Sequence, residues 1–118
     1  MFEYKVRLYF GAHDHSYQRT LPMYRNGSFS TRKDNYSTGE DYIVSLVEGV
    51  AGNDEGMVES IDELKDITVS YTVNETGLGL LEVEAEKVKY THFSTKRGKT
   101  DQFVMTRAPK VKRNLIGN

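Results

Sequence analysis

The chain has 118 residues, and its 16 Lys and Arg against 17 Asp and Glu give a formal net charge of −1 at pH 7. A chain of this size buries roughly two-thirds of its unfolded surface, which supports one core but excludes a large catalytic domain with a second module. The near-neutral, interspersed charge gives no general attraction for nucleic acid or anionic membranes, and the absence of cysteine excludes disulfides and thiolate chemistry.

β-Branched and aromatic residues recur in short runs bounded by turn-forming residues, which predicts a mostly β chain. Val6–Phe10 is the first predicted strand. Leu21–Tyr24 is a short strand that carries Pro22, so it belongs at the edge of a sheet or just outside one. Asn26-Gly27 is typical of a hairpin turn, and the polar segment 28–40 indicates a long surface loop.

Tyr42–Val47 is almost continuously apolar, the pattern of a strand covered on both faces, and we expect it to be central in a sheet. It leads into a glycine-rich loop over residues 49–56. Apolar residues at three-residue spacing indicate a short helix within 57–65, and alternation over 67–72 indicates the next strand.

The segment 81–86 alternates apolar and acidic residues, which predicts a half-buried strand with an acidic outer face. Val88–Ser94 is its expected hairpin partner, so that Lys87 and Lys89 meet the acidic side chains across the ladder. Residues 102–105 form the last predicted strand. We therefore expect one domain over residues 1–108, followed by a basic tail over 109–118 that frays.

Two histidines follow the first predicted strand at once. If the backbone stays extended, His13 and His15 point to the same side with their Cα atoms about 7 Å apart. Their imidazoles then converge on one metal ion, or on two ions roughly 3.5–4 Å apart, and Gly11 lets the backbone come close to the metal. As a bare pattern, His-x-His is also typical of two polar surface histidines.

The surrounding sequence resembles the purple acid phosphatase branch of the calcineurin-like metallophosphoesterases. In that family a buried strand is followed by Gly-His-x-His, commonly continued by Tyr-Glu-Arg and then Pro-x-Tyr. Residues 12–24 read Ala-His-Asp-His-Ser-Tyr-Gln-Arg-Thr-Leu-Pro-Met-Tyr. Ala12 replaces the glycine of the block and Gln18 replaces the usual glutamate, and neither change prevents metal binding by the histidines.

Later segments resemble the same family in the same order. Tyr42–Val47 with its glycine loop is similar to the strand and Gly-Gly-Asn loop that follow the histidine block. Gly77–Val83 is similar to a Gly-x-Gly-x-Leu-x-Val strand, and residues 92–103 are similar to the closing hairpin. The resemblance implies that the chain is the C-terminal portion of a four-layer α/β/β/α metallophosphoesterase sandwich, which by itself is mostly β.

The resemblance also implies a role for each residue of the block. His13 ligates one metal and His15 the other, in a dinuclear centre of iron with zinc, manganese or a second iron that hydrolyses phosphomonoesters. Gly11, Tyr17 and Arg19 are expected in supporting roles; from the residue types alone, Tyr17 is expected in packing and Arg19 in a structural ion pair. His92 is expected on the surface or in a cross-strand contact.

The family's earlier metal-binding blocks should precede the histidines, yet only 12 residues do so. Gly52-Asn53-Asp54-Glu55 comes after the pair and lacks the histidine of Gly-Asn-His-Glu, so we reject it as a metal block. The chain alone should therefore not form the complete centre. The remaining ligands would come from the upstream part of the same enzyme or from a second chain.

An alternative from another class is a non-catalytic, β-rich piece that acts structurally or assembles with itself. Strands without their parent sheet leave unpaired edges, and Tyr42–Val47 is then prone to self-association.

Three sequons, at Asn26, Asn35 and Asn74, lie among turn-forming residues and favour the secretory pathway. We therefore expect a secreted or lysosomal/vacuolar protein. The first residues lack the pattern of a secretory signal, so such a signal would lie outside this chain.

Overall fold

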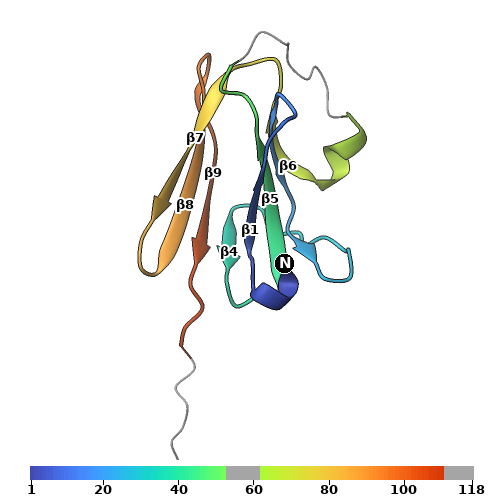
Figure 1. The fold of residues 1–118 in the computed structure, drawn as a ribbon, viewed down its shortest axis with the longest axis vertical. Coiled ribbons are helices and arrows are strands. Elements are labelled where there is room, and N and C mark those ends of the chain that lie inside the picture. The colour runs from blue at the N-terminus through green and yellow to red at the C-terminus, as the bar shows by residue number, and fades with distance from the viewer. Residues whose placement is uncertain (53–61, 111–118) are drawn as a thin grey trace, which may run out of the picture.

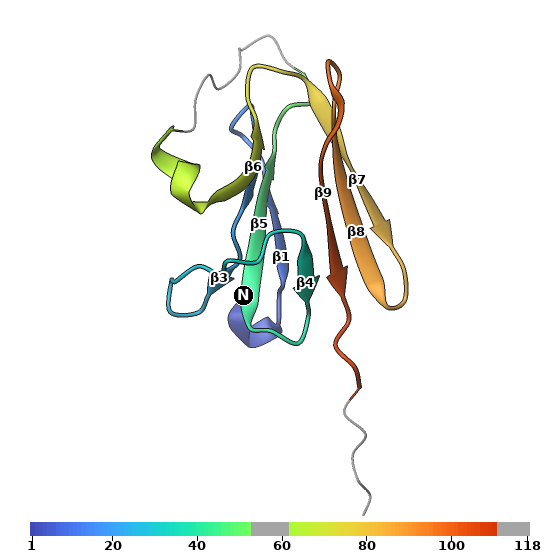
Figure 2. The ribbon, with the colours of Figure 1, turned by 180° about the vertical axis from the view of Figure 1, so that it is seen from behind.

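The computed structural model of the chain describes residues 1–52 and 62–110 and is built mostly of strands, as predicted. The helices in these ranges are two short 3-10 segments, η1 (Phe2–Tyr4) and η2 (Asp62–Ile67). The strands lie in two sheets that face each other (Figure 1; Figure 2). They are β1 (Leu8–Gly11), β2 (Tyr17–Thr20), β3 (Met23–Tyr24), β4 (Asn35–Ser37), β5 (Tyr42–Glu48), β6 (Thr68–Thr72), β7 (Gly77–Val83), β8 (Lys87–Ser94) and β9 (Gly98–Thr106).

The first sheet has the order β1-β5-β2-β6, and β3 pairs with the beginning of β5. β1 runs parallel to β5, whereas β2 runs antiparallel to both β5 and β6. The apolar run Tyr42–Val47 is thus central in this sheet, as its pattern predicted. β3 lies outside the main strand order, where it pairs with the beginning of β5 and Met23 also forms an isolated bridge with Phe29, which agrees with the peripheral position predicted for Leu21–Tyr24.

The second sheet has the order β4-β9-β8-β7, with β4 parallel to β9 and the other neighbours antiparallel. The predicted hairpins are present, and β9 is longer than expected. Lys89 Nζ lies 2.9 Å from Glu82, its cross-strand partner, which confirms the expected pairing for Lys89, whereas Lys87 Nζ lies 3.8 Å from Glu84 within the turn rather than across the ladder.

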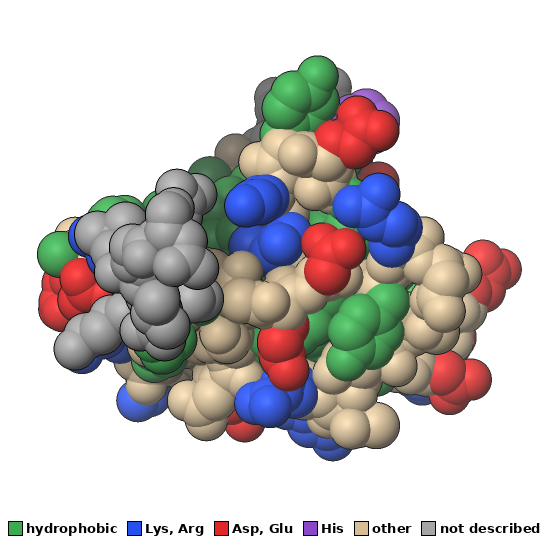
Figure 3. Space-filling view, turned by 90° about the horizontal axis from the view of Figure 1, so that it is seen from below, with side chains coloured by type: hydrophobic (Ala, Val, Ile, Leu, Met, Phe, Trp, Pro, Cys, Tyr) green, Lys and Arg blue, Asp and Glu red, His purple; other side chains and the backbone are tan. Residues whose placement is uncertain are grey.

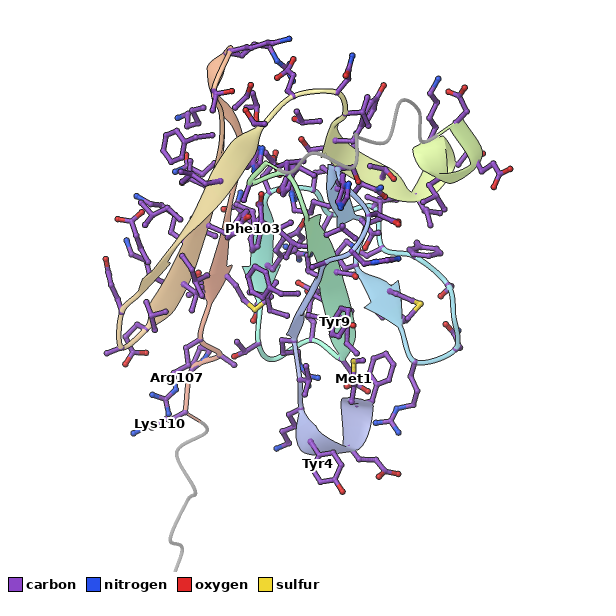
Figure 4. All side chains as sticks on the ribbon, turned by 45° about the horizontal axis from the view of Figure 1, so that its top comes forward. Met1, Tyr4, Tyr9, Phe103, Arg107 and Lys110 are labelled. Atoms are coloured by element: carbon purple, nitrogen blue, oxygen red, sulfur yellow. The ribbon has the colours of Figure 1, made fainter. Side chains whose placement is uncertain are left out.

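The core lies between the two sheets and is rich in aromatic rings. Phe103 on β9 packs against Tyr36 of β4 and Tyr90 of β8, with ring centroids 5.4 and 5.5 Å apart, and Figure 4 shows it among the side chains between the sheets. Edge-to-face and offset contacts of this kind add to the burial of apolar area. The buried apolar cluster consists of Tyr17, Tyr36, Tyr42, Val44, Leu46, Val50, Tyr90, Phe103 and Met105.

Three expectations about the elements are wrong. The segment 28–40 is more than a surface loop, because it contains β4 and places Tyr36 in the core. The first strand begins at Leu8 rather than Val6. The end of β7 is exposed rather than half-buried, since it is the outer strand of its sheet: Val83 is 70% exposed.

Other expectations fall partly outside the described ranges. Most of the predicted helix over 57–65 lies outside the described ranges. Its last residues belong to η2, where Leu64 is exposed. Asp54, Glu55 and most of the predicted tail also lie outside these ranges. Among the described residues, no helix is long and apolar enough to cross a membrane.

Candidate metal-ligand loop and the buried cluster beneath it

His13 and His15 lie in the bend between β1 and β2. The backbone is not extended there, as the sequence argument assumed, because His13 has a φ of 87° in the left-handed region. The alternation rule therefore does not set the direction of the two imidazoles. His13 is exposed and His15 is half-buried, so both rings belong to the surface of the molecule.

Contacts with the end of β5 fix the position of this bend. β1 and β5 are parallel neighbours, so the segments that follow them leave the sheet at the same edge. Gly49 N donates a hydrogen bond to Ser16 O at 3.0 Å, and Ser16 N donates to Asp14 O at 2.8 Å. A Cβ at Gly49 would lie 1.9 Å from Asp14 O, so this close approach requires glycine.

Tyr17, the first residue of β2, anchors the bend from behind. Its side chain is buried, and its hydroxyl donates a 2.6 Å hydrogen bond to Asp101 on β9 of the other sheet. Burial, reinforced by the Asp101 carboxylate, raises the pKa of Tyr17 far above its usual value, so the phenol stays protonated. Gln18, also buried, donates to Ser16 Oγ at 2.8 Å. The predicted packing role of Tyr17 is confirmed.

Arg19 is the most completely buried cation among the described residues, with a side chain that is 0% exposed. Its Nε and Nη2 each lie 2.7 Å from an oxygen of Asp101 in a bidentate pair, and Nη2 also lies 3.0 Å from Asp34. Nη1 donates to the Tyr36 hydroxyl and to Lys33 O. The predicted structural ion pair of Arg19 is therefore confirmed.

This arginine joins the two sheets through rings as well as through charges. Its Cζ lies 5.1 Å from the centroid of Phe103 and 5.9 Å from that of Tyr36. Burial alone would lower the pKa of Arg19, but the hydrogen bonds and charge of Asp101 raise it, and the guanidinium stays charged.

His92 is buried, and its expected surface position is wrong. Its ring stacks on Tyr17, with centroids 3.9 Å apart and planes 6° apart, and Nδ1 lies 2.9 Å from Glu48 Oε2. Tyr90 donates to the same carboxylate oxygen. His92 Nε2 and Glu48 Oε1 are shielded from solvent and form no hydrogen bond among the described atoms.

The sequence of β8 carries a signal for this cluster. Along β8, alternate residues Tyr90, His92 and Ser94 share one face, and all three are buried. A histidine on the same strand face as a core tyrosine points inward with it. Its partner Glu48 ends β5, and a strand-end acid has no local pattern that shows which ring it meets.

Comparison with known proteins finds a match in structure but none in sequence. No family model and no curated protein matches the sequence. The structure matches that of a purple acid phosphatase isolated from yellow lupin (Lupinus luteus) seeds, with a TM-score of 0.73 and 23% identity over 88% of this chain. The chain has the fold of part of a purple acid phosphatase. It spans 18% of the length of that structure.

The fold predicted from the resemblance is therefore confirmed: a mostly β chain that forms a portion of a purple acid phosphatase fold. Among the residues that the structure describes, no three His, Cys, Asp or Glu side chains gather as a metal site. Within these ranges the two histidines of the bend therefore do not belong to a group of three or more such side chains.

Proposed function

We propose that this chain is part of a metal-dependent acid phosphatase that hydrolyses phosphomonoesters, and that His13 and His15 supply two ligands of its dinuclear metal centre. The observation that carries the proposal is the purple acid phosphatase fold, with the His-x-His bend at an edge where two parallel strands end. Ligands in α/β proteins bind outside the carboxyl ends of parallel strands. The bend after β1 occupies such a position.

The donor chemistry of the bend fits the proposed metals. Imidazole suits iron, zinc and other divalent transition metals, and the bend carries two imidazoles. The bound metals would bind phosphate oxygens and supply a hydroxide nucleophile near neutral pH. Gly49 and the Ser16 backbone hold the bend that presents the imidazoles, while Tyr17 and Arg19 tie β2 to the opposite sheet.

The remaining ligands, including a bridging carboxylate, would come from the upstream part of the same enzyme or from a second chain. Support comes from β1, which pairs with β5 on one side and with no other strand among the described residues. Tyr9 and Phe10 on this strand are each 44% exposed. An open strand edge with exposed aromatic rings is suited to pairing with a further strand.

A second candidate is a non-catalytic, self-assembling β-rich piece. It is favoured by the outer strand of the second sheet, where Leu78, Leu80, Leu81 and Val83 are exposed. Edge strands with exposed apolar residues are templates for pairing with another chain. This candidate predicts sedimentation far above the 13.5 kDa of the monomer without bound metal.

The test is metal content per chain, measured by elemental mass spectrometry on protein purified without chelator and joined to the upstream part or second chain that completes the centre, together with hydrolysis of p-nitrophenyl phosphate. His13→Ala and His15→Ala should each lower both quantities. Ala12→Ser, in the same exposed bend, is the matched control and should change neither. Metal binding and hydrolysis at parental levels in both histidine variants would refute the assignment. A parent chain that sediments as a large, metal-free assembly would favour the second candidate.

We further propose that Asn26, Asn35 and Asn74 carry glycans and that the protein follows the secretory route, to the outside or to a lysosome or vacuole. All three asparagines are exposed, which is a requirement for the modification. Protein secreted from a eukaryotic host should lose mass on treatment with an N-glycosidase. An unchanged mass would contradict the proposal.

A further inference from the structure

A second surface feature lies at the opposite end of β1 from the histidine bend. It is a pocket of about 770 Å³ whose walls include Lys5, Arg7, Thr38, Arg107 and Lys110. Arg7 precedes β1 and His13 follows it, and six residues of extended chain span roughly 20 Å, so the two features are separate. Figure 4 shows Arg107 and Lys110 beside each other after β9, at the end of the molecule where η1 also lies.

The walls of the pocket carry an excess of positive charge. Four of its residues are cations, and Arg7 alone among them has an ion-pair partner within the described ranges, with Nη1 3.2 Å from Asp41. Figure 3 shows Lys and Arg side chains gathered on this face, with acidic side chains among them. Cations that share one concavity repel each other and raise the local concentration of anions.

Arg7 adds a sign that the pocket is incomplete without a ligand. Its side chain is only 11% exposed, and its Nε donates to Thr38 O at 3.2 Å. Nη1 is shielded from solvent and lies 3.2 Å from Asp41 Oδ1, an ion pair that does not have the geometry of a hydrogen bond. The hydrogen-bonding capacity of Nη1 is therefore not used by Asp41, and a well-placed oxygen of an anionic ligand would use it.

The pocket is held in shape by its backbone. Ala108 N donates to Thr38 Oγ1 at 2.9 Å, which fixes the segment after β9 against the turn after β4. A Cβ at Gly39 would lie 3.0 Å from the Ala108 Cβ, so the two segments already pack closely. Arg107 N donates to Glu86 O at 2.8 Å. The wall that carries Arg107 is therefore fixed by the protein itself.

We propose that this pocket binds an anion that carries two or more phosphate groups. Its volume lies in the range of small-molecule sites and exceeds the needs of a single phosphate. Four cations against one carboxylate match a ligand with several negative charges, and guanidinium groups bind phosphate oxygens in a bidentate manner. The pocket is independent of the metal chemistry proposed for the histidine bend.

The experiment is titration calorimetry of the full chain with tripolyphosphate in EDTA, at low and at physiological salt. Arg107→Gln and Lys5→Gln remove exposed cations and should each weaken binding about tenfold or more. Lys99→Gln removes the same charge from an exposed position at the other end of β9 and should leave the affinity unchanged. His13→Ala should also bind as the parent does, which separates this site from the metal centre.

Binding that added salt weakens, and that only the pocket variants lose, would support the proposal. No binding by the parent chain, or equal weakening by Lys99→Gln, would overturn it. Vesicles of phosphatidylcholine with phosphatidic acid provide the other source of phosphate. If the chain sediments with these vesicles, loses this in the Arg107 and Lys5 variants, and does not bind tripolyphosphate, the proposal of a soluble ligand is overturned in favour of a lipid headgroup.

Discussion

Substitution of the two carboxylates that hold Arg19 provides a test of what holds the two sheets together. Asp101 and Asp34 both contact the same guanidinium, at 2.7 and 3.0 Å. Their surroundings differ, because the Asp101 side chain is 7% exposed and the Asp34 side chain is 64% exposed. Asp101→Asn and Asp34→Asn therefore make the same chemical change to the same arginine at two different depths.

The buried change should cost far more. Removal of one partner from a buried ion pair typically costs 3–5 kcal/mol, because the other charge is left uncompensated. Asparagine keeps one oxygen as an acceptor for Tyr17 or Arg19, so we expect about 3 kcal/mol for Asp101→Asn. The exposed pair is screened by water and is worth about 1 kcal/mol at most. A domain with roughly 5–15 kcal/mol of stability would survive the second change easily and the first with little to spare.

The assay is equilibrium unfolding in urea, followed by tyrosine fluorescence and by circular dichroism, with the free energy of unfolding taken from linear extrapolation. Asp101→Asn should lose about 2 kcal/mol more than Asp34→Asn, or be largely unfolded in buffer. Equal losses in the two variants would show that the burial of the Arg19 pair does not determine its contribution.

Two further predictions concern the bend and the tyrosines. Gly49→Ala should displace the bend and destabilise the fold, because the added Cβ would lie 1.9 Å from Asp14 O. Gly11→Ala is the control and should be tolerated, because the nearest atom to its Cβ would be 3.4 Å away. Thermal unfolding of both variants checks this, and equal midpoints would contradict it. Burial raises the pKa of Tyr36 and of Tyr42 to about 12 from 10.0, so the folded state holds these protons more tightly, and stability should be level up to about pH 10 and fall between pH 10 and 12. Each tyrosine contributes about 2 to 3 kcal/mol at most to this loss in the free energy of unfolding. Urea unfolding at several pH values measures the loss. A free energy of unfolding that stays level to pH 12 would refute the argument.

The sequence was sufficient for elements whose pattern reports burial directly. Tyr42–Val47 is apolar at nearly every position, and such a run is stable only where both faces are covered, so its central place in the sheet followed. The acidic partner of Lys89 across the ladder was predicted for a similar reason, because cross-strand neighbours in a hairpin follow from the position of its turn.

The failures have a common physical cause, which is that polar residues in the core depend on partners distant in the chain. Tyr36 lies in a polar segment that reads as a loop, and it becomes a core residue only because β4 pairs with β9, almost seventy residues away. His92 is buried because Glu48 and Tyr17 come from the other sheet. Alternation along β8 indicates that His92 points inward, but no local pattern identifies its partners. Tyr36 was therefore predicted in a surface loop, and His92 at the surface or in a cross-strand contact.

The geometry of the histidine pair was also not derivable from spacing. The alternation argument requires extended backbone, and the positive φ of His13 breaks it. The bend exists because β1 must turn to reach β2, which lies on the far side of β5. The topology of the sheet, rather than the residues between the strands, sets the backbone that presents the two imidazoles.

These observations divide the motif of residues 12–24 into two parts with different physical roles. The first part, with His13 and His15, is at the surface and contributes little to the core. The second part, with Tyr17 and Arg19, is buried and bound to Asp101 of the opposite sheet. Since the ligand-bearing bend joins directly to this anchored strand, any loss of the Asp101 contact should loosen the bend as well. Asp101→Asn should therefore lower metal content through the fold, whereas His13→Ala should lower it with the urea midpoint unchanged.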